Sequence, residues 1–335
     1  MSWTAPMMCR FIGLWVLAGM LGGCSGKKSE DAATEEENIL KRFSDKELHT
    51  NWQQALIDTA QILPGGPRKN DIPAIDYPEF ISVAQAADVL QPMDFGILVQ
   101  INEVTRFYPL RILNWHEIVN DVVGGVPVAV TFCPLCGSAI TFSRVLGSDT
   151  LLFGVSGLLY ESNLLMFDEE TESLWLQASG VCVVGDYVGK RLALVNSMIV
   201  AFEEVLRHHP QAQVLSFQTG YDRNYMQNPY AAYDRTEELF FPVSRMFPLF
   251  SNKDMMYVVA LDTLTVAFHW KTLVEQGRAE VNTSRGPLTV YVTDYMPRAT
   301  LSQQKDPLPG YFSFWFSWYA VHGTHGLYWP QQQLR

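Results

Sequence analysis

The sequence has few cysteines, few basic residues and few long hydrophobic runs. Its 335 residues include only five cysteines, which excludes a scaffold held together by several disulfides. The 24 Lys and Arg against 35 Asp and Glu give a formal net charge of −11, which argues against a nucleic acid partner. The sequence also lacks the Gly-x-Ser-x-Gly elbow, the His-Glu-x-x-His zinc motif and the phosphate-binding loop with its lysine. It therefore carries no signature of a serine hydrolase, a zinc protease or a nucleotide-binding enzyme.

The N-terminus has the pattern of an export signal. A short apolar run, residues 11–21, follows Arg10, and it is too short to span a bilayer. The run ends in Leu-Gly-Gly-Cys at residues 21–24, which resembles the lipobox of bacterial lipoproteins. That resemblance implies cleavage before Cys24, acylation of its thiol and attachment to a membrane. A plain secretory signal and an uncleaved anchor are the alternatives. Ser25 is not the aspartate of an inner-membrane retention signal, which favours the outer membrane, on its periplasmic face.

Composition and repeats divide the chain into five parts. Residues 1–23 are the predicted signal peptide, and the polar residues 24–38 form a predicted flexible tether, because they cannot bury enough apolar surface to fold. Residues 39–70 form a predicted N-terminal helical segment. A first repeat then covers 71–234, and a second, shortened repeat covers 235–335.

The repeat rests on two segments that share one displacement. Residues 96–113 align with 256–273, and residues 126–132 align with 286–292, both at 160 residues and without gaps. The displacement places Pro127 on Pro287. A third segment, from Phe202, resembles the one from Trp315 at a displacement of 113, so that His209 falls on His322.

The predicted elements are mostly strands. Residues 96–109 predict a β-hairpin with Asn102-Glu103 at its turn. Apolar spacing predicts a helix over 110–123, ended by two glycines, and then a strand over 126–132. A further hairpin, ITFSR with LLFGVSG, is expected around Gly147. The predicted fold class is β-rich α+β: two duplicated halves form one sheet or barrel system, with a few peripheral helices.

The most specific chemical motif is Cys133-Pro134-Leu135-Cys136-Gly137. Proline favours a tight turn, which brings two cysteines close enough for a disulfide. The pair could be a structural disulfide or a redox-active dithiol, although the strand that follows it replaces the helix of thioredoxin-like sites. A closed zinc site would need a second pair, whereas Cys133 and Cys136 with His116 would suit copper. A lone histidine on the apolar face of a predicted helix, as His116 is, is however more often a packed, hydrogen-bonded core residue than a ligand.

Several segments together resemble a bacterial and archaeal family of unknown function, number 3179. They are YPLRILNWHEIVND, VPVAVTFCPLCGSAITFSR, FGVSGLLYESNLLMFDEETESLW and VVGDYVGKRL. The family implies secreted or lipid-anchored proteins, and some members are identified as selenoproteins, which implies redox chemistry. The resemblance implies that Cys133 and Cys136 react, with His116, Arg144 and Asp168 as their neighbours in the motif. The second repeat has Thr293 and Asp294 in place of Cys133 and Pro134, so only one half can hold such a site.

The leading hypothesis from the sequence is a periplasmic lipoprotein that resembles a thiol–disulfide oxidoreductase through Cys133 and Cys136. One alternative is a protein that binds copper, or another metal, through the cysteine pair and a histidine. The other is a non-catalytic interaction module with a structural disulfide. The sequence does not indicate which protein or small molecule is the partner.

Overall fold

The computed structural model describes residues 43, 47–302, 304 and 306–330. The predicted signal peptide, Cys24 and the tether therefore lie outside the described residues. None of the described helices is long and apolar enough to cross a membrane.

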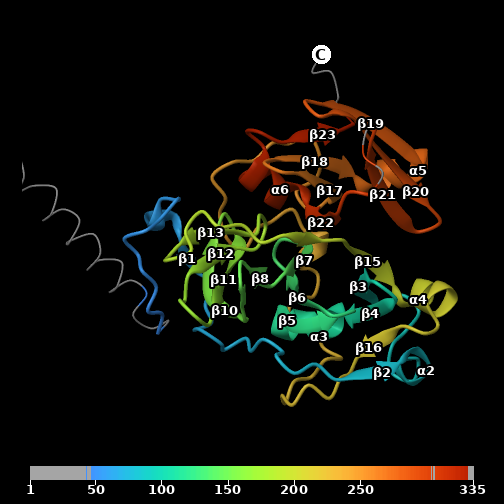
Figure 1. Ribbon diagram of the computed structural model, residues 1–335, viewed down its shortest axis with the longest axis horizontal. Coiled ribbons are helices and arrows are strands. Elements are labelled where there is room, and N and C mark those ends of the chain that lie inside the picture. The colour runs from blue at the N-terminus through green and yellow to red at the C-terminus, as the bar shows by residue number, and fades with distance from the viewer. Residues whose placement is uncertain (1–42, 44–46, 303, 305, 331–335) are drawn as a thin grey trace, which may run out of the picture.

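Both halves of the chain follow the same path of strand, strand, helix and three strands (Figure 1). In the first half these elements are β3 (Phe95–Ile101), β4 (Val104–Pro109), α3 (Leu110–His116), β5 (Ile118–Val123), β6 (Val126–Cys133) and β7 (Ser138–Ser143). In the second half they are β17 (Met255–Leu261), β18 (Leu264–His269), α5 (Trp270–Gln276), β19 (Arg278–Thr283), β20 (Gly286–Thr293) and β21 (Met296–Leu301). From β3 to the end of β6 every boundary recurs 160 residues later, as the aligned sequence segments predict.

A strand, a helix and a short strand close each half. They are β15 (Ser197–Ala201), α4 (Phe202–His208) and β16 (Gln213–Leu215), and then β22 (Gly310–Phe314), α6 (Trp315–His322) and β23 (Leu327–Trp329). β15 pairs antiparallel with β3 as β22 does with β17, while β16 and β23 run parallel to β4 and β18. The third sequence similarity, at a displacement of 113, thus falls on equivalent elements.

The two halves share one sheet. Its strand order is β23-β18-β17-β22-β7-β6-β5, and β22 of the second half joins β7 of the first where Phe312 pairs with Ala139. Two flanking sheets complete the halves: β15-β3-β4-β16-β2, in which β2 is Phe80–Ser82, and β19-β20-β21. The fold is therefore β-rich α+β with a shared sheet system, as the sequence predicts.

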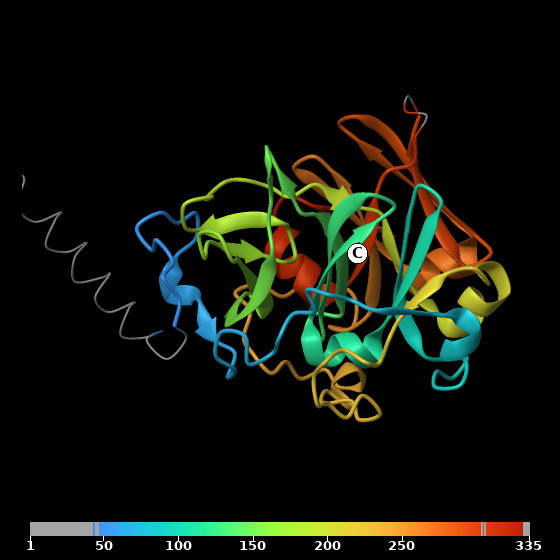
Figure 2. The ribbon, with the colours of Figure 1, turned by 60° about the horizontal axis from the view of Figure 1, so that its bottom comes forward.

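The first half also carries an insertion between β7 and β15. It contains β8 (Val145–Leu146), β9 (Asp149–Thr150), β10 (Phe153–Tyr160), β11 (Asn163–Asp168), β12 (Leu174–Leu176), β13 (Val181–Val184) and β14 (Leu194–Val195). Strands β10 to β13 form a sheet with β1 (Leu63–Pro64), and β14 pairs with β7. Helix α6 of the second half lies beside this inserted sheet (Figures 1 and 2). The insertion therefore meets the second half at α6, where the Ser317 hydroxyl donates to the Asn163 side chain at 2.9 Å.

The structure corrects two predicted elements. The helix predicted over 110–123 ends at His116, and β5 takes up Ile118–Val123, because Glu117 has a positive φ and the following IVNDVV is rich in β-branched residues. The hairpin expected around Gly147 is confined to β8 and β9, and β10 pairs with β11 instead of β7.

The N-terminal region up to the first repeat contains little regular structure. Within the described part of the predicted helical segment 39–70, the structure has a 3-10 helix, Thr59–Gln61, and strand β1. Two prolines and two glycines at residues 64–67 disfavour a helix there. The remaining short elements are β2 (Phe80–Ser82), α2 (Val83–Ala86) and a 3-10 helix, Tyr233–Arg235.

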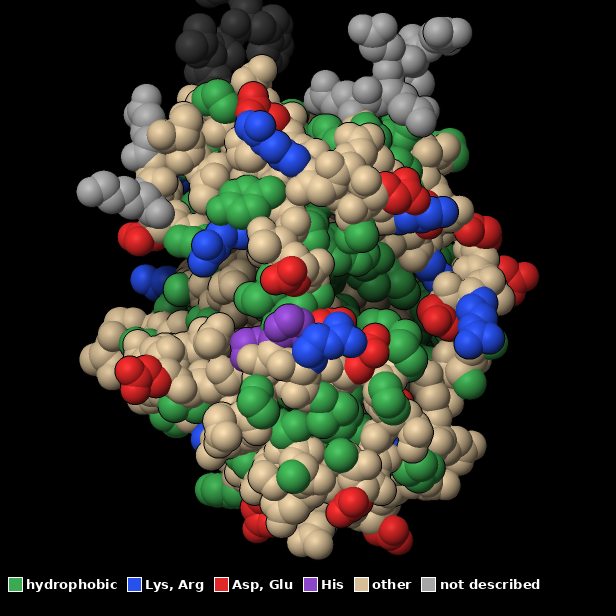
Figure 3. All heavy atoms as spheres, turned by 90° about the vertical axis from the view of Figure 1, so that its right-hand side faces the viewer, with side chains coloured by type: hydrophobic (Ala, Val, Ile, Leu, Met, Phe, Trp, Pro, Cys, Tyr) green, Lys and Arg blue, Asp and Glu red, His purple; other side chains and the backbone are tan. Residues whose placement is uncertain are grey.

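The surface mixes charges of both signs. On the face shown in Figure 3, acidic and basic side chains are interspersed, and hydrophobic side chains gather in a hollow across the middle of the molecule.

Candidate functional site

The cysteine pair lies on the turn between β6 and β7. Cys133 is the last residue of β6 and pairs with Ser138, so four residues form the turn, and the Cys136 amide donates to the Cys133 carbonyl at 3.1 Å. Gly137 has a φ of 56°, and a Cβ there would lie 2.6 Å from the Phe314 ring. A glycine is therefore needed both for the backbone and for the close approach of β22. At the same place the second half makes a two-residue turn between Thr293 and Met296.

The two sulfur atoms lie 2.9 Å apart without a disulfide bond. Both side chains are buried, Cys133 being 2% exposed and Cys136 0%. Burial raises the pKa of the Cys136 thiol well above its usual value, the adjacent Cys133 raises it further, and a hydrogen bond with Ser317 opposes the shift. The Cys136 thiol is therefore protonated and unreactive at neutral pH unless a base assists it.

Buried polar side chains hold the two strands together next to the turn. The Gln177 amide of the insertion donates to the Thr131 hydroxyl at 2.9 Å, and its carbonyl accepts from the Ser138 hydroxyl at 2.7 Å. All three side chains are fully buried. Since a buried polar group without a partner is costly, this network holds the ends of β6 and β7 in one arrangement.

The tip of the β10–β11 hairpin covers Cys136. Its turn residues Glu161 and Ser162 have positive φ, and the Ser162 carbonyl accepts from the Cys136 thiol at 3.2 Å. The side-chain Oδ1 of the neighbouring Asn163 accepts from the Ser317 hydroxyl of α6 at 2.9 Å. The insertion and the second half thus both reach the cysteine pair.

Glu117 is the acidic group next to the pair. It follows α3 directly, is 7% exposed, and burial raises the pKa of its carboxyl group to about 7. The Tyr230 hydroxyl donates to its carboxylate at 3.4 Å. The charge of Glu117 raises the pKa of Cys136, and both Glu117 and Cys133 raise that of Tyr230, after burial as the main cause.

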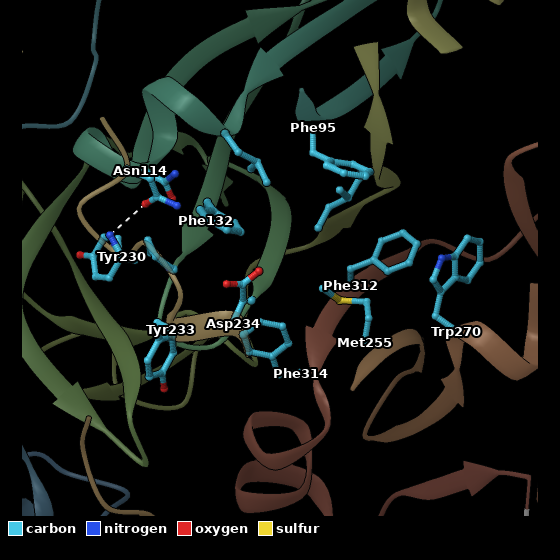
Figure 4. Close-up of a pocket in the computed structure, with 15 residues that line it drawn as sticks. Phe95, Asn114, Phe132, Tyr230, Tyr233, Asp234, Met255, Trp270, Phe312 and Phe314 are labelled. Atoms are coloured by element: carbon cyan, nitrogen blue, oxygen red, sulfur yellow. Dashed lines mark hydrogen bonds between the residues drawn. The ribbon is translucent and has the colours of Figure 1, made fainter. Parts of the chain in front are cut away.

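A cavity of about 390 Å³ lies on the outer side of the turn. Figure 4 shows Phe132, Tyr230 and Tyr233 on one side of it and Met255, Trp270 and Phe312 on the other. Its walls come from the first half, the second half and the connecting segment 216–254, and they include Pro134 and Gly137 of the turn. Apart from the two tyrosines and Trp270, its polar lining residues are Asn114, Asn228 and Asp234. A largely apolar ligand would fit such a cavity.

His116 is buried, and both of its ring nitrogens form hydrogen bonds. The side chain is fully buried, its Nδ1 donates to the Pro73 carbonyl at 2.8 Å, and its Nε2 accepts from the Tyr225 hydroxyl at 2.7 Å. Burial lowers its pKa, so the ring is neutral at pH 7. With both nitrogens engaged, the imidazole is that of a packed core histidine.

Arg144 is also engaged elsewhere. Its guanidinium donates to the carbonyls of Val128, Leu151 and Asp121 at 2.5 to 3.2 Å. Val128 lies five residues before Cys133 on β6, which is about 17 Å along a strand. The structure therefore does not bring Arg144 to the cysteine pair.

Asp168 organises the turn between β11 and β12. Its carboxylate accepts from the Trp175 indole at 2.8 Å and from the Thr171 amide at 2.7 Å. Asp168 is the last residue of β11. It lies five residues, again about 17 Å along the strand, from Asn163 at the hairpin tip that covers Cys136. Burial raises the pKa of the Cys182 thiol to about 12, and the charge of Asp168 contributes to this increase.

In the part of the chain that the structure describes, no three His, Cys, Asp or Glu side chains are grouped so that they could hold a metal ion. The suggested set of Cys133, Cys136 and His116 is thus not assembled. Copper binding gains no support from the arrangement of these residues.

Comparison with known proteins decides the family. Residues 69–305, more than half of the chain, match the family described as "Protein of unknown function (DUF3179)". The chain belongs to this family. No curated protein and no solved structure matches it.

Sequence reasoning identified the two cysteines but not the groups around them. Glu117, Tyr230, Ser162 and Ser317 come from four separate segments that only the fold brings together. One signal was available: the displacement of 160 places Glu117 on Gly277, which ends the equivalent helix.

Proposed function

We propose that the protein is an exported lipoprotein whose Cys133–Cys136 pair alternates between dithiol and disulfide by exchange with a small external disulfide. The separation of 2.9 Å between the two unbonded sulfur atoms is the observation that carries this proposal. A disulfide bond is about 2.05 Å long, so it can form with a shift of less than about 1 Å and without rebuilding the turn.

The reaction proceeds in two exchanges. One cysteine thiolate attacks a sulfur of the substrate R–S–S–R′ and forms a mixed disulfide, while R′–S⁻ leaves and takes up a proton. The second cysteine then loses its proton and attacks the mixed disulfide, and R–S⁻ leaves and is protonated. Two electrons pass from the cysteine pair to the substrate, which becomes two thiols.

The cavity favours a particular class of substrate. Because its walls are mainly aromatic and apolar, the groups next to the substrate disulfide should be apolar or aromatic. Both cysteines are buried behind Pro134 and Gly137, so a folded protein could not reach them without displacing the turn. A small disulfide fits this geometry better.

The test uses the full-length protein in detergent. The reduced protein is mixed with a small aromatic disulfide, the remaining thiols are alkylated, and the cysteine peptides are identified by mass spectrometry. We expect Cys133 and Cys136 to become linked and Cys182 to stay reduced, and Cys133→Ser should abolish the linkage whereas Cys182→Ser should not. Absence of the linkage, or a reduction potential below about −300 mV, typical of structural bridges, would overturn the proposal.

Membrane attachment is tested separately. Labelling of cells with palmitate should mark the wild-type protein but not Cys24→Ala, and fractionation should place the labelled protein in the outer membrane. A soluble, unlabelled wild-type protein would contradict the lipoprotein part of the proposal and leave the redox part intact.

A further inference from the structure

Glu117 occupies a backbone conformation that suits glycine. Its φ and ψ are 57° and −30°, and its amide donates to the Leu113 carbonyl as the residue that ends α3. In the second half Gly277 ends α5 in nearly the same conformation, at 71° and −17°, with the equivalent bond to Leu273. A side chain is strained there and glycine is not.

Its carboxyl group is also unfavourably placed for stability. It is buried, and among the described residues it forms no ion pair; the Tyr230 hydroxyl is the partner that the structure gives it. A strained backbone and a buried, uncompensated acid at one position indicate a residue retained for its chemistry.

The backbone fixes Glu117 against the cysteine turn. Its carbonyl accepts from the Phe132 amide, the residue before Cys133, at 2.8 Å. Its side chain shares a second cavity, of about 290 Å³, with Leu135 of the turn and with Tyr230. Among the described residues, Tyr230 and Tyr233 also interact electrostatically with the pair. Burial, as the main cause, raises the pKa of both, so they remain protonated at neutral pH.

We propose that Glu117 is the general base and acid of the cysteine pair; this inference rests on the proposed function. Its carboxylate accepts the proton of the attacking thiol, and the glutamic acid so formed returns that proton to the departing R′–S⁻. The cycle repeats for the second cysteine and R–S⁻, so Glu117 ends unchanged. Without such an acceptor the buried Cys136 thiol would react slowly, because only the thiolate is nucleophilic.

The experiment measures how fast the reduced full-length protein forms the Cys133–Cys136 disulfide with a small aromatic disulfide between pH 5 and pH 9. For the wild type we expect the rate to rise with an inflection near pH 7, where the carboxyl group ionises. Glu117→Gln should be about 100-fold slower at pH 7 and lose the inflection, since general bases contribute about 10² to 10⁴-fold. Glu117→Gly should be slow as well, even though it relieves the backbone strain.

A matched control is Glu172→Gln. Glu172 also has a positive φ, but its carboxylate pairs with Lys69 at 2.8 Å and not with the Cys133–Cys136 pair. This variant should keep the wild-type rate within about twofold, which is small beside the 10² to 10⁴-fold of a general base. A wild-type rate and pH profile in Glu117→Gln would overturn this inference and leave the proposed function standing. Failure of the wild type to form the disulfide at all would instead overturn the function.

Discussion

The two halves of the molecule share a backbone path but bury different side chains. In the first half the Asp121 carboxylate is buried between the Arg106 guanidinium and the Tyr108 hydroxyl, which donates to it at 2.5 Å. At the equivalent positions, 160 residues later, the second half has Val281, Val266 and Phe268, all buried. The fold itself therefore needs no charge at these places.

The same comparison singles out the cysteine turn. The second half connects the two strands with two residues where the first uses four, and it ends its helix with Gly277 where the first has Glu117. The second half shows what the backbone requires. The departures in the first half then mark either a buried polar cluster or the candidate site.

The largest expected effect comes from breaking the polar cluster. Asp121→Val should lower the free energy of unfolding by about 3 kcal/mol, because it leaves the Arg106 charge and the Tyr108 hydroxyl without their buried partner. The lower end of the usual range applies since Arg106 remains 17% exposed. Urea denaturation followed by tryptophan fluorescence measures the change.

The combined variant Arg106→Val/Tyr108→Phe/Asp121→Val copies the second half. It should recover most of that loss, because apolar replacement of a whole buried ionic group is often neutral. If the combined variant is as unstable as Asp121→Val, the two halves do not offer interchangeable solutions, and the comparison fails at this cluster.

The next effect is a pH dependence that Glu117 gives to the first half. Its folded pKa of about 7 lies above the ordinary value of 4.5, so the acid is protonated in both states at low pH and costs nothing there. As pH rises from 4.5 to 7 the unfolded state ionises first, and the folded state loses stability relative to it. The full loss, reached above pH 7, is up to about 3 kcal/mol.

Glu117→Gln mimics the protonated acid and isolates this effect. The variant and the wild type should have equal free energies of unfolding near pH 4, and the variant should be more stable above pH 7. Parallel stability curves for the two proteins over the whole pH range would show that folding does not raise the pKa of Glu117.

The hydrophobic pattern and the 160-residue displacement of the repeat predicted much of the fold. The first hairpin, the strand before Cys133 and the duplication all follow from residues that alternate or recur, which are local signals. The helix predicted over 110–123 is confirmed for 110–116 and wrong beyond it, because the apolar residues of IVNDVV fit a buried strand as well as a helix. The positive φ of Glu117 ends the helix, and the spacing of hydrophobic residues does not predict a positive φ.

The site was harder to predict than the fold. Cys133 and Cys136 are only three positions apart in the sequence, so their spacing alone indicates that they meet. Tyr230 and Ser317 lie 94 and 181 residues beyond Cys136, and only tertiary packing brings them to it. Arg144 and Asp168 show the converse: they share the family motif with the cysteines, yet Arg144 follows the far end of β7 and Asp168 lies at the far end of β11.

The smallest expected effect tests the strain on which the comparison of Glu117 with Gly277 depends. A Cβ at Gly277 would meet no atom within 4 Å, so Gly277→Ala changes backbone strain without a steric clash. It should lower the free energy of unfolding by about 1 to 2 kcal/mol, and Glu117→Gly should raise it, both as shifts of the urea midpoint at constant m-value. An unchanged midpoint in Gly277→Ala would mean that side chains are tolerated at this helix end. Glu117 would then need no functional reason for being there.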